Sequence, residues 1–338
     1  MAVLAKSSAS DLEKAWDKLS HPPAFSYLRK PEVGLVMVQA RAGGNGPRFN
    51  LGEMTVTRCT VQVEGGYIGW AYVAGRSPGH AEAAAVFDAL LQDEGRREFF
   101  MKEIILPLEA ILKEKKGPRS GPGRFHAGRI FHHGEGGFIL IGLEKRRGLL
   151  PGFSDPVRDS QVAFRTVLGA MSYPGRIFML DVGLIAPEPL HPASAAVALA
   201  LLDFETPLWT DLPYDSEGVD WIRFHCGCPL AAEPAAGRFA LITGDPNRMP
   251  LEEFNPGTDE SAGDSGTLII QAAGLAFGKG RKLTGPGIEK EHFLEVEGMP
   301  ECFWRALKAN QLRYPLGVDV ILTAGEVLAA LPRTTLVE

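Results

Sequence analysis

The sequence predicts two domains: a small α+β domain over residues 1–112 and a layered α/β domain over residues 151–338. The chain has 338 residues, which exceeds the usual size of one hydrophobic core. The first region places strands ahead of helices, whereas the second alternates helices with short apolar strands. Between them, residues 113–150 are rich in glycine, proline and basic side chains, which is typical of a connecting segment.

The composition excludes several classes of protein. Hydrophobic residues make up 45% of the chain and charged residues 22%, as in an ordinary soluble globular protein. No apolar run approaches the roughly 20 residues needed to cross a bilayer, and the first residues lack the long apolar core of a signal peptide. We therefore expect no membrane partner and a cytoplasmic location.

The charge is unevenly distributed along the chain. The net charge is −6, yet residues 113–147 contain 9 basic and 3 acidic side chains. Such a basic run can bind nucleic acid or phosphate groups, or it can be a solvated tether. Because its aromatic side chains do not form an interleaved platform comparable to that of single-strand binders, we expect no nucleic-acid partner.

The first domain is expected to begin with a short helix over residues 10–19, capped by Ser10. The apolar run 33–42 has the length of a strand and the composition of one that is buried on both faces. Residues 54–63 alternate in polarity, and residues 67–75 return after a Gly-Gly turn, which predicts a β-hairpin.

Two helices complete this domain. Ser77 can cap the first helix. Pro78 fits its first position, because the backbone N–H there would have no partner within the helix and its absence costs no hydrogen bond. The second spans about residues 97–112. Their apolar faces are formed by Ala83, Val86, Phe87, Leu90 and Leu91 in the first helix and by Phe100, Ile104, Leu108 and Ile111 in the second.

The second domain is expected to open with a well-bounded helix. Asp155 can cap it, Pro156 fits its first turn, and Pro174-Gly175 ends it. Steps of four, three, four and three define one face of this helix, formed by Val157, Gln161, Phe164, Leu168 and Met171. The pattern predicts an amphipathic helix.

The rest of the second domain alternates between the two kinds of element. We expect helices over residues 191–206 and near 299–309, and strands at 176–182, 207–212, 221–226, 238–243, 267–273 and 318–325. Helices alternating with short apolar strands indicate a layered α/β sheet.

The four cysteines, Cys59, Cys226, Cys228 and Cys302, are too few and too scattered for a disulfide framework. Cys226-x-Cys228 is compatible with a metal or redox site, or with two reduced thiols in or beside a strand. It lacks a second ligand pair at metal spacing, so we expect no metal. His225 beside Cys226 is compatible with nucleophilic chemistry or with a structural histidine.

Three other groups of polar residues bear on cofactors. His126, His132 and His133 lie in the connecting segment without a carboxylate or cysteine in a ligand-like pattern. Residues 257–266 form an acidic loop that can hold a cation or remain solvated. Two lysines lie in a Gly/Lys/Arg turn at residues 277–283, where burial would not lower a lysine pKa for aldimine chemistry. We expect no cofactor.

Four arginines are candidates for contacts with carboxylates or phosphates: Arg58, Arg76, Arg165 and Arg223. The alternative for each is a structural ion pair or a contact with another subunit. No catalytic, cofactor-binding or metal-binding residue is assigned.

Short motifs follow one another in order at the start of the second domain: Phe153, Asp155-Pro156-Val157, Asp159-Ser160-Gln161, Phe164-Arg165 and Ala170-Met171-Ser172-x-Pro174-Gly175. Further motifs lie at residues 283–288, 314–326 and 331–338. In this order and at this spacing, they resemble the H subunit of bacterial carbon–phosphorus lyase, PhnH. The resemblance covers residues 151–338.

The first domain carries its own ordered motifs: Arg41, Thr57-Arg58, Gly75-Arg76, His80-Ala81-Glu82 and Asp88-Ala89-Leu90. They are similar to those of the G subunit of the same lyase, PhnG, over residues 1 to about 112. The basic helix and Phe-Phe-x-Met-Val-Arg-Gly-like end of G subunits are missing, and the connecting segment occupies their place. The sequence therefore resembles a fusion of the two subunits.

The resemblance implies a fold and a function. The second domain is expected to have a three-layer α/β fold like that of pyridoxal-phosphate transferases, without the cofactor. The chain is expected to act with the PhnI, PhnJ and PhnL components in phosphonate catabolism. There, ATP and methylphosphonate yield ribose 1-methylphosphonate 5-triphosphate and adenine. The resemblance attributes nucleosidase chemistry to the I subunit and radical, iron–sulfur cleavage to the J subunit.

The chain would then be an accessory subunit of a transferase complex, without an active site of its own. The resemblance also implies a homodimer or higher assembly through the second domain. The alternatives are a stand-alone phosphonate- or nucleotide-binding module and a stand-alone enzyme that uses the acidic loop or the arginines.

Overall fold

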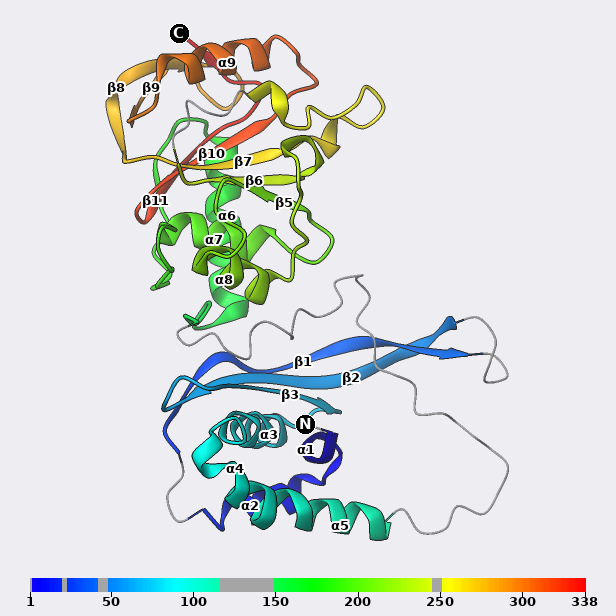
Figure 1. The fold of residues 1–338 in the computed structure, drawn as a ribbon. Coiled ribbons are helices and arrows are strands. Elements are labelled where there is room, and N and C mark those ends of the chain that lie inside the picture. Colours follow the sequence, from blue (N-terminus) through cyan, green and yellow to red (C-terminus); the bar gives the residue numbers. More distant parts are fainter. Residues whose placement is uncertain (1, 20–22, 42–47, 116–148, 245–250) are drawn as a thin grey trace. The chain divides into compact units, whose positions relative to one another are not determined.

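The computed structural model describes residues 2–19, 23–41, 48–115, 149–244 and 251–338. The chain divides into two compact units, Met1–Pro151 and Gly152–Glu338, and each combines helices with β-sheet (Figure 1). The histidines of the connecting segment lie outside the described residues. Most of that segment does too, including the apolar run FILIGL at residues 138–143, whose composition is compatible with an isolated strand.

The first unit contains a three-stranded antiparallel sheet in the order β1-β2-β3. The strands are β1 (Phe25–Arg41), β2 (Arg48–Val63) and β3 (Ile68–Ala74). The predicted hairpin is confirmed as β2 and β3. Its turn contains Gly65 and Gly66 at φ values of +91° and +82°, which residues with a Cβ rarely adopt.

Strand β1 lies at an edge of this sheet, and the expectation that its apolar run is buried on both faces is wrong. Val33 and Leu35 are 47% and 62% exposed. Burial on both faces is typical of parallel strands covered by helices on two sides, whereas an antiparallel sheet can leave one face in water. The apolar run alone does not distinguish the two cases.

Helices cover one face of the sheet (Figure 1). They are α1 (Ala2–Lys6), α2 (Ala9–Trp16), α3 (Pro78–Leu90), α4 (Glu94–Phe100) and α5 (Leu106–Lys115), with a π-helical turn at Met101–Ile105. Ser8 caps α2 in place of Ser10, because the Ser8 hydroxyl accepts the Asp11 N–H at 3.2 Å. The core lies between the sheet and α3, where Phe87 packs edge-on against Trp16 and Phe100.

The second unit is built on a six-stranded sheet in the order β4-β11-β10-β7-β6-β5. The strands are β4 (Phe178–Met179), β5 (Leu208–Thr210), β6 (Phe239–Ile242), β7 (Thr267–Gln271), β10 (Asp319–Ala324) and β11 (Val327–Leu331). β5, β6, β7 and β10 are parallel, and β11 and β4 are antiparallel to their neighbours. The strands predicted at these four parallel positions are confirmed, whereas the one predicted at 176–182 shortens to two residues.

The sheet is covered on both sides, which gives three layers (Figure 1). One side carries α6 (Pro156–Ser172), α7 (Pro192–Leu201) and α8 (Glu217–Cys226). The other carries α9 (Glu301–Gln311) and a small sheet of β8 (Gly274–Thr284), β9 (His292–Glu297) and β12 (Leu336–Val337). A search of the described helices finds no segment with the length and apolar character to cross a membrane.

Two local predictions are wrong in this unit. Residues 221–226 form the end of helix α8 and not a strand. Ser216 caps this helix by accepting the Val219 N–H at 3.3 Å, and Gly227 ends it at a φ of +72°. These start and stop signals outweigh the strand-like composition of the segment. The expected turn at residues 277–283 lies within strand β8, where the pairing with β9 shifts register.

Helix α6 has the predicted bounds but an unexpected orientation. The Asp155 carboxylate accepts the Arg158 N–H at 3.1 Å, and Pro156 is the first helical residue. The buried side consists of small residues, Ala163, Val167 and Ala170. The face with the larger apolar side chains is exposed, because α6 packs beside the alanine-rich helix α7 through its small residues.

Candidate functional site

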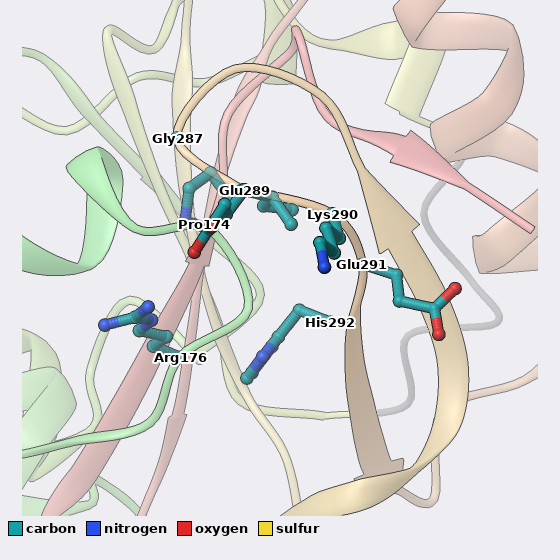
Figure 2. A pocket seen from close by; sticks show the side chains of 8 residues that line it. Pro174, Arg176, Gly287, Glu289, Lys290, Glu291 and His292 are labelled. Carbon is teal, nitrogen blue, oxygen red and sulfur yellow. The ribbon is translucent and has the colours of Figure 1, made fainter.

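The candidate site is a pocket between two motif segments of the second unit (Figure 2). Pro174 and Arg176 belong to the segment that follows α6, and residues 287–292 lead into β9. The pocket has a volume of about 280 Å³, which is near the lower end for small-molecule sites. Both segments contain motifs on which the family resemblance rests.

Glycines allow the two segments to meet. Gly175 has a φ of +76°, and a Cβ there would lie 2.3 Å from the Leu283 side chain. Gly287 has a φ of +84°, and a Cβ there would lie 2.7 Å from the Pro174 ring. A side chain at either position would therefore be strained and would push the segments apart.

A hydrogen bond joins the same segments. His292 Nε2 lies 3.0 Å from the carbonyl oxygen of Gly175. A carbonyl oxygen can only accept, so Nε2 carries the proton and donates it. The imidazole also packs against the Phe277 ring at a centroid distance of 5.3 Å. His292 therefore holds the pocket together, with one ring nitrogen already committed.

The pocket is polar and carries charges of both signs. Figure 2 shows that Arg176 comes from one segment and Lys290 from the other, while Glu291 points away from them. Glu289 and Glu291 also line the pocket, and Glu291 lies 3.9 Å from Lys282, which is not a lining residue. Arg176 has no ion pair among the described residues, and its guanidinium lies 4.9 Å from the Tyr173 ring centroid. An exposed arginine and lysine are suited to an anionic group such as a phosphonate or phosphate.

The four arginines singled out from the sequence do not line this pocket. Arg58 forms an ion pair with Glu32 across strands β1 and β2, with Nε and Oε1 2.5 Å apart. Arg76 is exposed between β3 and α3. Arg165 is exposed on α6, and Arg223 is half-buried on α8. Arg58 thus has a structural partner, whereas Arg76 belongs to the first unit and Arg165 and Arg223 belong to the second.

The motif residues of the first unit mainly fasten helix α3. The Thr57 hydroxyl donates to the Gly75 carbonyl at 2.7 Å and accepts the Ser77 N–H at 2.9 Å. His80 Nε2 lies 2.9 Å from the Leu4 carbonyl oxygen, which ties α3 to α1.

Two carboxylates on α3 complete this fastening. Glu82 accepts a hydrogen bond from the Tyr27 hydroxyl, and Asp88 accepts the Trp70 N–H at 3.1 Å. Burial and the Glu82 carboxylate raise the Tyr27 pKa. These polar groups join α3 to β1 and β3, so they account for the motif without a ligand.

The cysteines have structural surroundings. Burial raises the pKa of Cys59 to about 12 and that of Cys228 to about 11. His225 packs against the rings of Trp221 and Phe224, each at a centroid distance of 4.8 Å. The Cys226 thiol lies 3.6 Å from the Ala198 carbonyl oxygen. These contacts support the structural interpretation of His225 and of the thiols.

Asp264 of the acidic loop and Lys282 of β8 also have partners within the unit. Asp264 lies 3.3 Å from Arg238 and accepts a hydrogen bond from Ser261 at 2.6 Å. Among the described residues, no group of three or more histidine, cysteine or acidic side chains is placed to hold a metal ion. Lys282 forms an ion pair with Glu338 at 2.8 Å, and this hydrogen bond raises the Lys282 pKa. Aldimine chemistry needs the opposite shift.

Sequence reasoning missed the charged and titratable members of the pocket, which are Arg176, Glu289, Lys290, Glu291 and His292. The available signal was the glycine pattern, since Pro174-Gly175 and residues 285–287 were both recognised as motifs. Nothing in the sequence indicates that segments so far apart lie side by side.

Comparisons with known proteins give each unit a family. Residues 151–338 match the family described as bacterial phosphonate metabolism protein PhnH, and residues 1–121 match the family described as phosphonate metabolism protein PhnG.

Individual relatives agree with these families. The chain is 35% identical over 187 residues to the alpha-D-ribose 1-methylphosphonate 5-triphosphate synthase subunit PhnH of Rhizobium meliloti (strain 1021), covering 55% of this chain and 94% of that protein. It is 42% identical over 118 residues to subunit PhnG of the same synthase and organism, covering 34% of this chain and 76% of that protein.

A third relative also matches part of the chain. It is the putative C-P lyase subunit protein HtxG of Stutzerimonas stutzeri, 32% identical over 175 residues, with 52% of this chain and 84% of that protein covered. The chain therefore belongs to the PhnH family through residues 151–338 and to the PhnG family through residues 1–121, with both subunits joined in one polypeptide.

Proposed function

We propose that this chain is the fused G/H subunit of a carbon–phosphorus lyase complex and has no active site of its own. It would support the formation of ribose 1-methylphosphonate 5-triphosphate from ATP and methylphosphonate, with release of adenine. The proposed partners are the PhnI, PhnJ and PhnL components.

One observation carries the proposal: two relatives named as subunits of one synthase match different parts of one chain. Fusion fixes the two modules at one copy each. It also replaces a bimolecular encounter with an intramolecular one, which raises their effective concentration. Proteins that work in one assembly gain from both effects.

The contacts of the motif residues support an accessory role. In the first unit, Thr57, His80 and Glu82 are occupied in joining secondary-structure elements. In the second, Asp155 caps a helix and the Gly175 carbonyl accepts a hydrogen bond from His292. Residues used in this way build a shape that other subunits can bind. We also propose that residues 113–150 form a connector between the two domains and that assembly through the second domain gives a homodimer or larger oligomer.

The proposed lack of a cofactor in a pyridoxal-phosphate-transferase-like fold is supported by Lys282. Its ammonium group is paired with Glu338 and is not held in an apolar pocket. The likeness of the second domain to that transferase fold stays a prediction.

The test follows adenine and ribose 1-methylphosphonate 5-triphosphate by liquid chromatography and ³¹P NMR, with ATP and methylphosphonate as substrates. The purified chain alone is expected to consume no ATP. Product is expected when the chain is combined with the cognate I and L subunits, and not when it is left out. Turnover by the isolated chain, or full activity of I and L without it, would contradict the proposal.

A second candidate is a module that binds phosphonate or nucleotide, and the pocket between Pro174 and His292 favours it. Calorimetric titration with methylphosphonate and with ATP tests it at two salt concentrations, since binding through Arg176 and Lys290 should weaken with salt. The double variant Arg176→Ala/Lys290→Ala should abolish the heat signal. Heat that the double variant retains would place any binding elsewhere.

A further inference from the structure

Helix α6 presents an apolar stripe that no other described part of the second unit covers. Val157, Phe164 and Leu168 are 83%, 51% and 55% exposed. At 1.5 Å per residue the stripe extends about 16 Å along the helix. Exposed apolar side chains that form a row on one helix face, unlike scattered ones, are typical of an interaction surface.

The stripe exists because α6 buries its other side. Ala163, Val167 and Ala170 face the interior of the unit, and their small side chains let the helix approach α7 closely. The larger apolar residues are not needed for that packing. They would lose contact with water only if another helix or chain bound there.

The margin of the stripe is basic. Arg158 and Arg165 each follow a stripe residue by one position, which places both about 100° around the helix on the same side. Both are exposed, and neither guanidinium has an ion pair among the described residues. The carboxylates at the helix start, Asp155 and Asp159, accept hydrogen bonds from the backbone instead.

We propose that this stripe docks an amphipathic helix of another subunit, with acidic residues along one margin of its apolar side. Helix-to-helix docking buries the stripe, and carboxylates opposite Arg158 and Arg165 supply orientation and specificity. The inference rests on the proposed function, because it takes the partner from the same complex.

A second copy of this chain fits the stripe less well. In a twofold antiparallel pair centred on Phe164, each Phe164 would meet its mate across the axis. Arg165 is the next residue, so the two guanidinium groups would lie near the axis and repel each other. A partner with acidic residues removes this repulsion and pairs both arginines.

The experiment measures binding of the full chain to the cognate I, J and L subunits, each purified, by biolayer interferometry. One variant, Phe164→Ser/Leu168→Ser, removes the apolar side chains of the stripe. The other, Arg158→Glu/Arg165→Glu, reverses the charge of its margin. Matched controls at the end of α9 are Leu312→Ser, where the native side chain is 82% exposed, and the exposed Arg313→Glu. Circular dichroism checks that every variant folds.

Each test variant is expected to weaken binding of one subunit at least tenfold, while the controls bind like the native chain. Margin reversal should also remove most of the salt dependence of that binding. If the native chain binds none of the three subunits, the proposed function fails and takes this inference with it. If the native chain binds and the stripe variants bind equally, the inference alone is overturned.

The oligomeric state tests the remaining possible occupant of the stripe, which is a second copy of this chain. Light scattering after size exclusion gives the mass of the native chain and of Phe164→Ser/Leu168→Ser. A native dimer that becomes a monomer in this variant would show that a second copy covers the stripe, which would overturn the inference.

Discussion

The backbone of Gly287 lies against the carbonyl oxygen of Ser172, so close that a Cβ on residue 287 would come within 2.4 Å of that oxygen. Ser172 is the last residue of α6, and Gly287 lies in the segment that leads into β9. This contact joins elements from opposite layers of the unit and sets the shape of the pocket. Two stretches that carry the family resemblance thus depend on each other sterically.

Gly287→Ala should therefore lower the stability of the second unit. The φ of +84° alone costs about 1–2 kcal/mol for a residue with a Cβ, and the clash with backbone adds to it, for a total on the order of 3 kcal/mol. Gly183→Ala is the matched control, since its φ is +60° and a Cβ there would meet nothing within 4 Å. Urea unfolding compares the two, and equal losses would show that the close contact has no energetic role.

The features with local causes could be predicted from the sequence. The cap at Asp155 and the Gly-Gly hairpin depend on residues a few positions away, and both are present. Which side of α6 is buried depends on the small residues of α7, so the spacing of large apolar residues pointed to the wrong side. The pocket joins Pro174 to Gly287, 113 residues apart, and no local pattern indicates that pairing.

Arg333 is expected to be a stabilising residue of the second unit. Its side chain is 14% exposed and that of Asp319 is 16% exposed, with Nη2 and Oδ2 2.5 Å apart. Arg333 also donates to the Ala262 carbonyl at 2.9 Å and to the Ser265 hydroxyl. Because Arg333→Met removes the ion-pair partner of the largely buried Asp319 carboxylate and leaves it, among the described residues, only the backbone N–H of residue 333 at 2.8 Å, it should cost about 3 kcal/mol.

The control for this substitution is Arg238→Met, which removes an exposed ion pair to Asp264. Such pairs contribute about 0–1 kcal/mol, so the change should be small. Thermal unfolding followed by near-ultraviolet circular dichroism measures both. Similar melting temperatures for the two variants would rule out a special role for the buried pair.

The cysteines should differ sharply in reactivity. Burial raises the pKa of Cys59 to about 12 and that of Cys228 to about 11, so little thiolate is present at pH 8. Cys302 is exposed and should be alkylated first by iodoacetamide. Mass spectrometry of timed samples identifies the labelled residues. If Cys59 in the folded chain were labelled as fast as Cys302, the description of Cys59 as a buried thiol with a raised pKa would be contradicted.

The same pKa values predict how stability depends on pH. The folded state holds the Cys59 proton more tightly than the unfolded state, in which the pKa is near its ordinary value of 9. This contribution to stability is therefore complete below about pH 9 and is lost as the pH rises toward 12. Cys59→Ala should flatten that alkaline decline, as measured by urea unfolding between pH 8 and pH 10.

Thr57 is expected to hold the start of helix α3. Its hydroxyl donates to the Gly75 carbonyl and accepts the Ser77 N–H, so Thr57→Val leaves both backbone groups without that partner. The buried position favours a loss of about 1–3 kcal/mol. Thr55→Val is the matched control, because the Thr55 side chain forms no hydrogen bond with any described residue. Hydrogen exchange should speed up at the first turn of α3 in Thr57→Val and stay unchanged in Thr55→Val. Equal exchange in both variants would mean that the β3–α3 connection is held by packing alone.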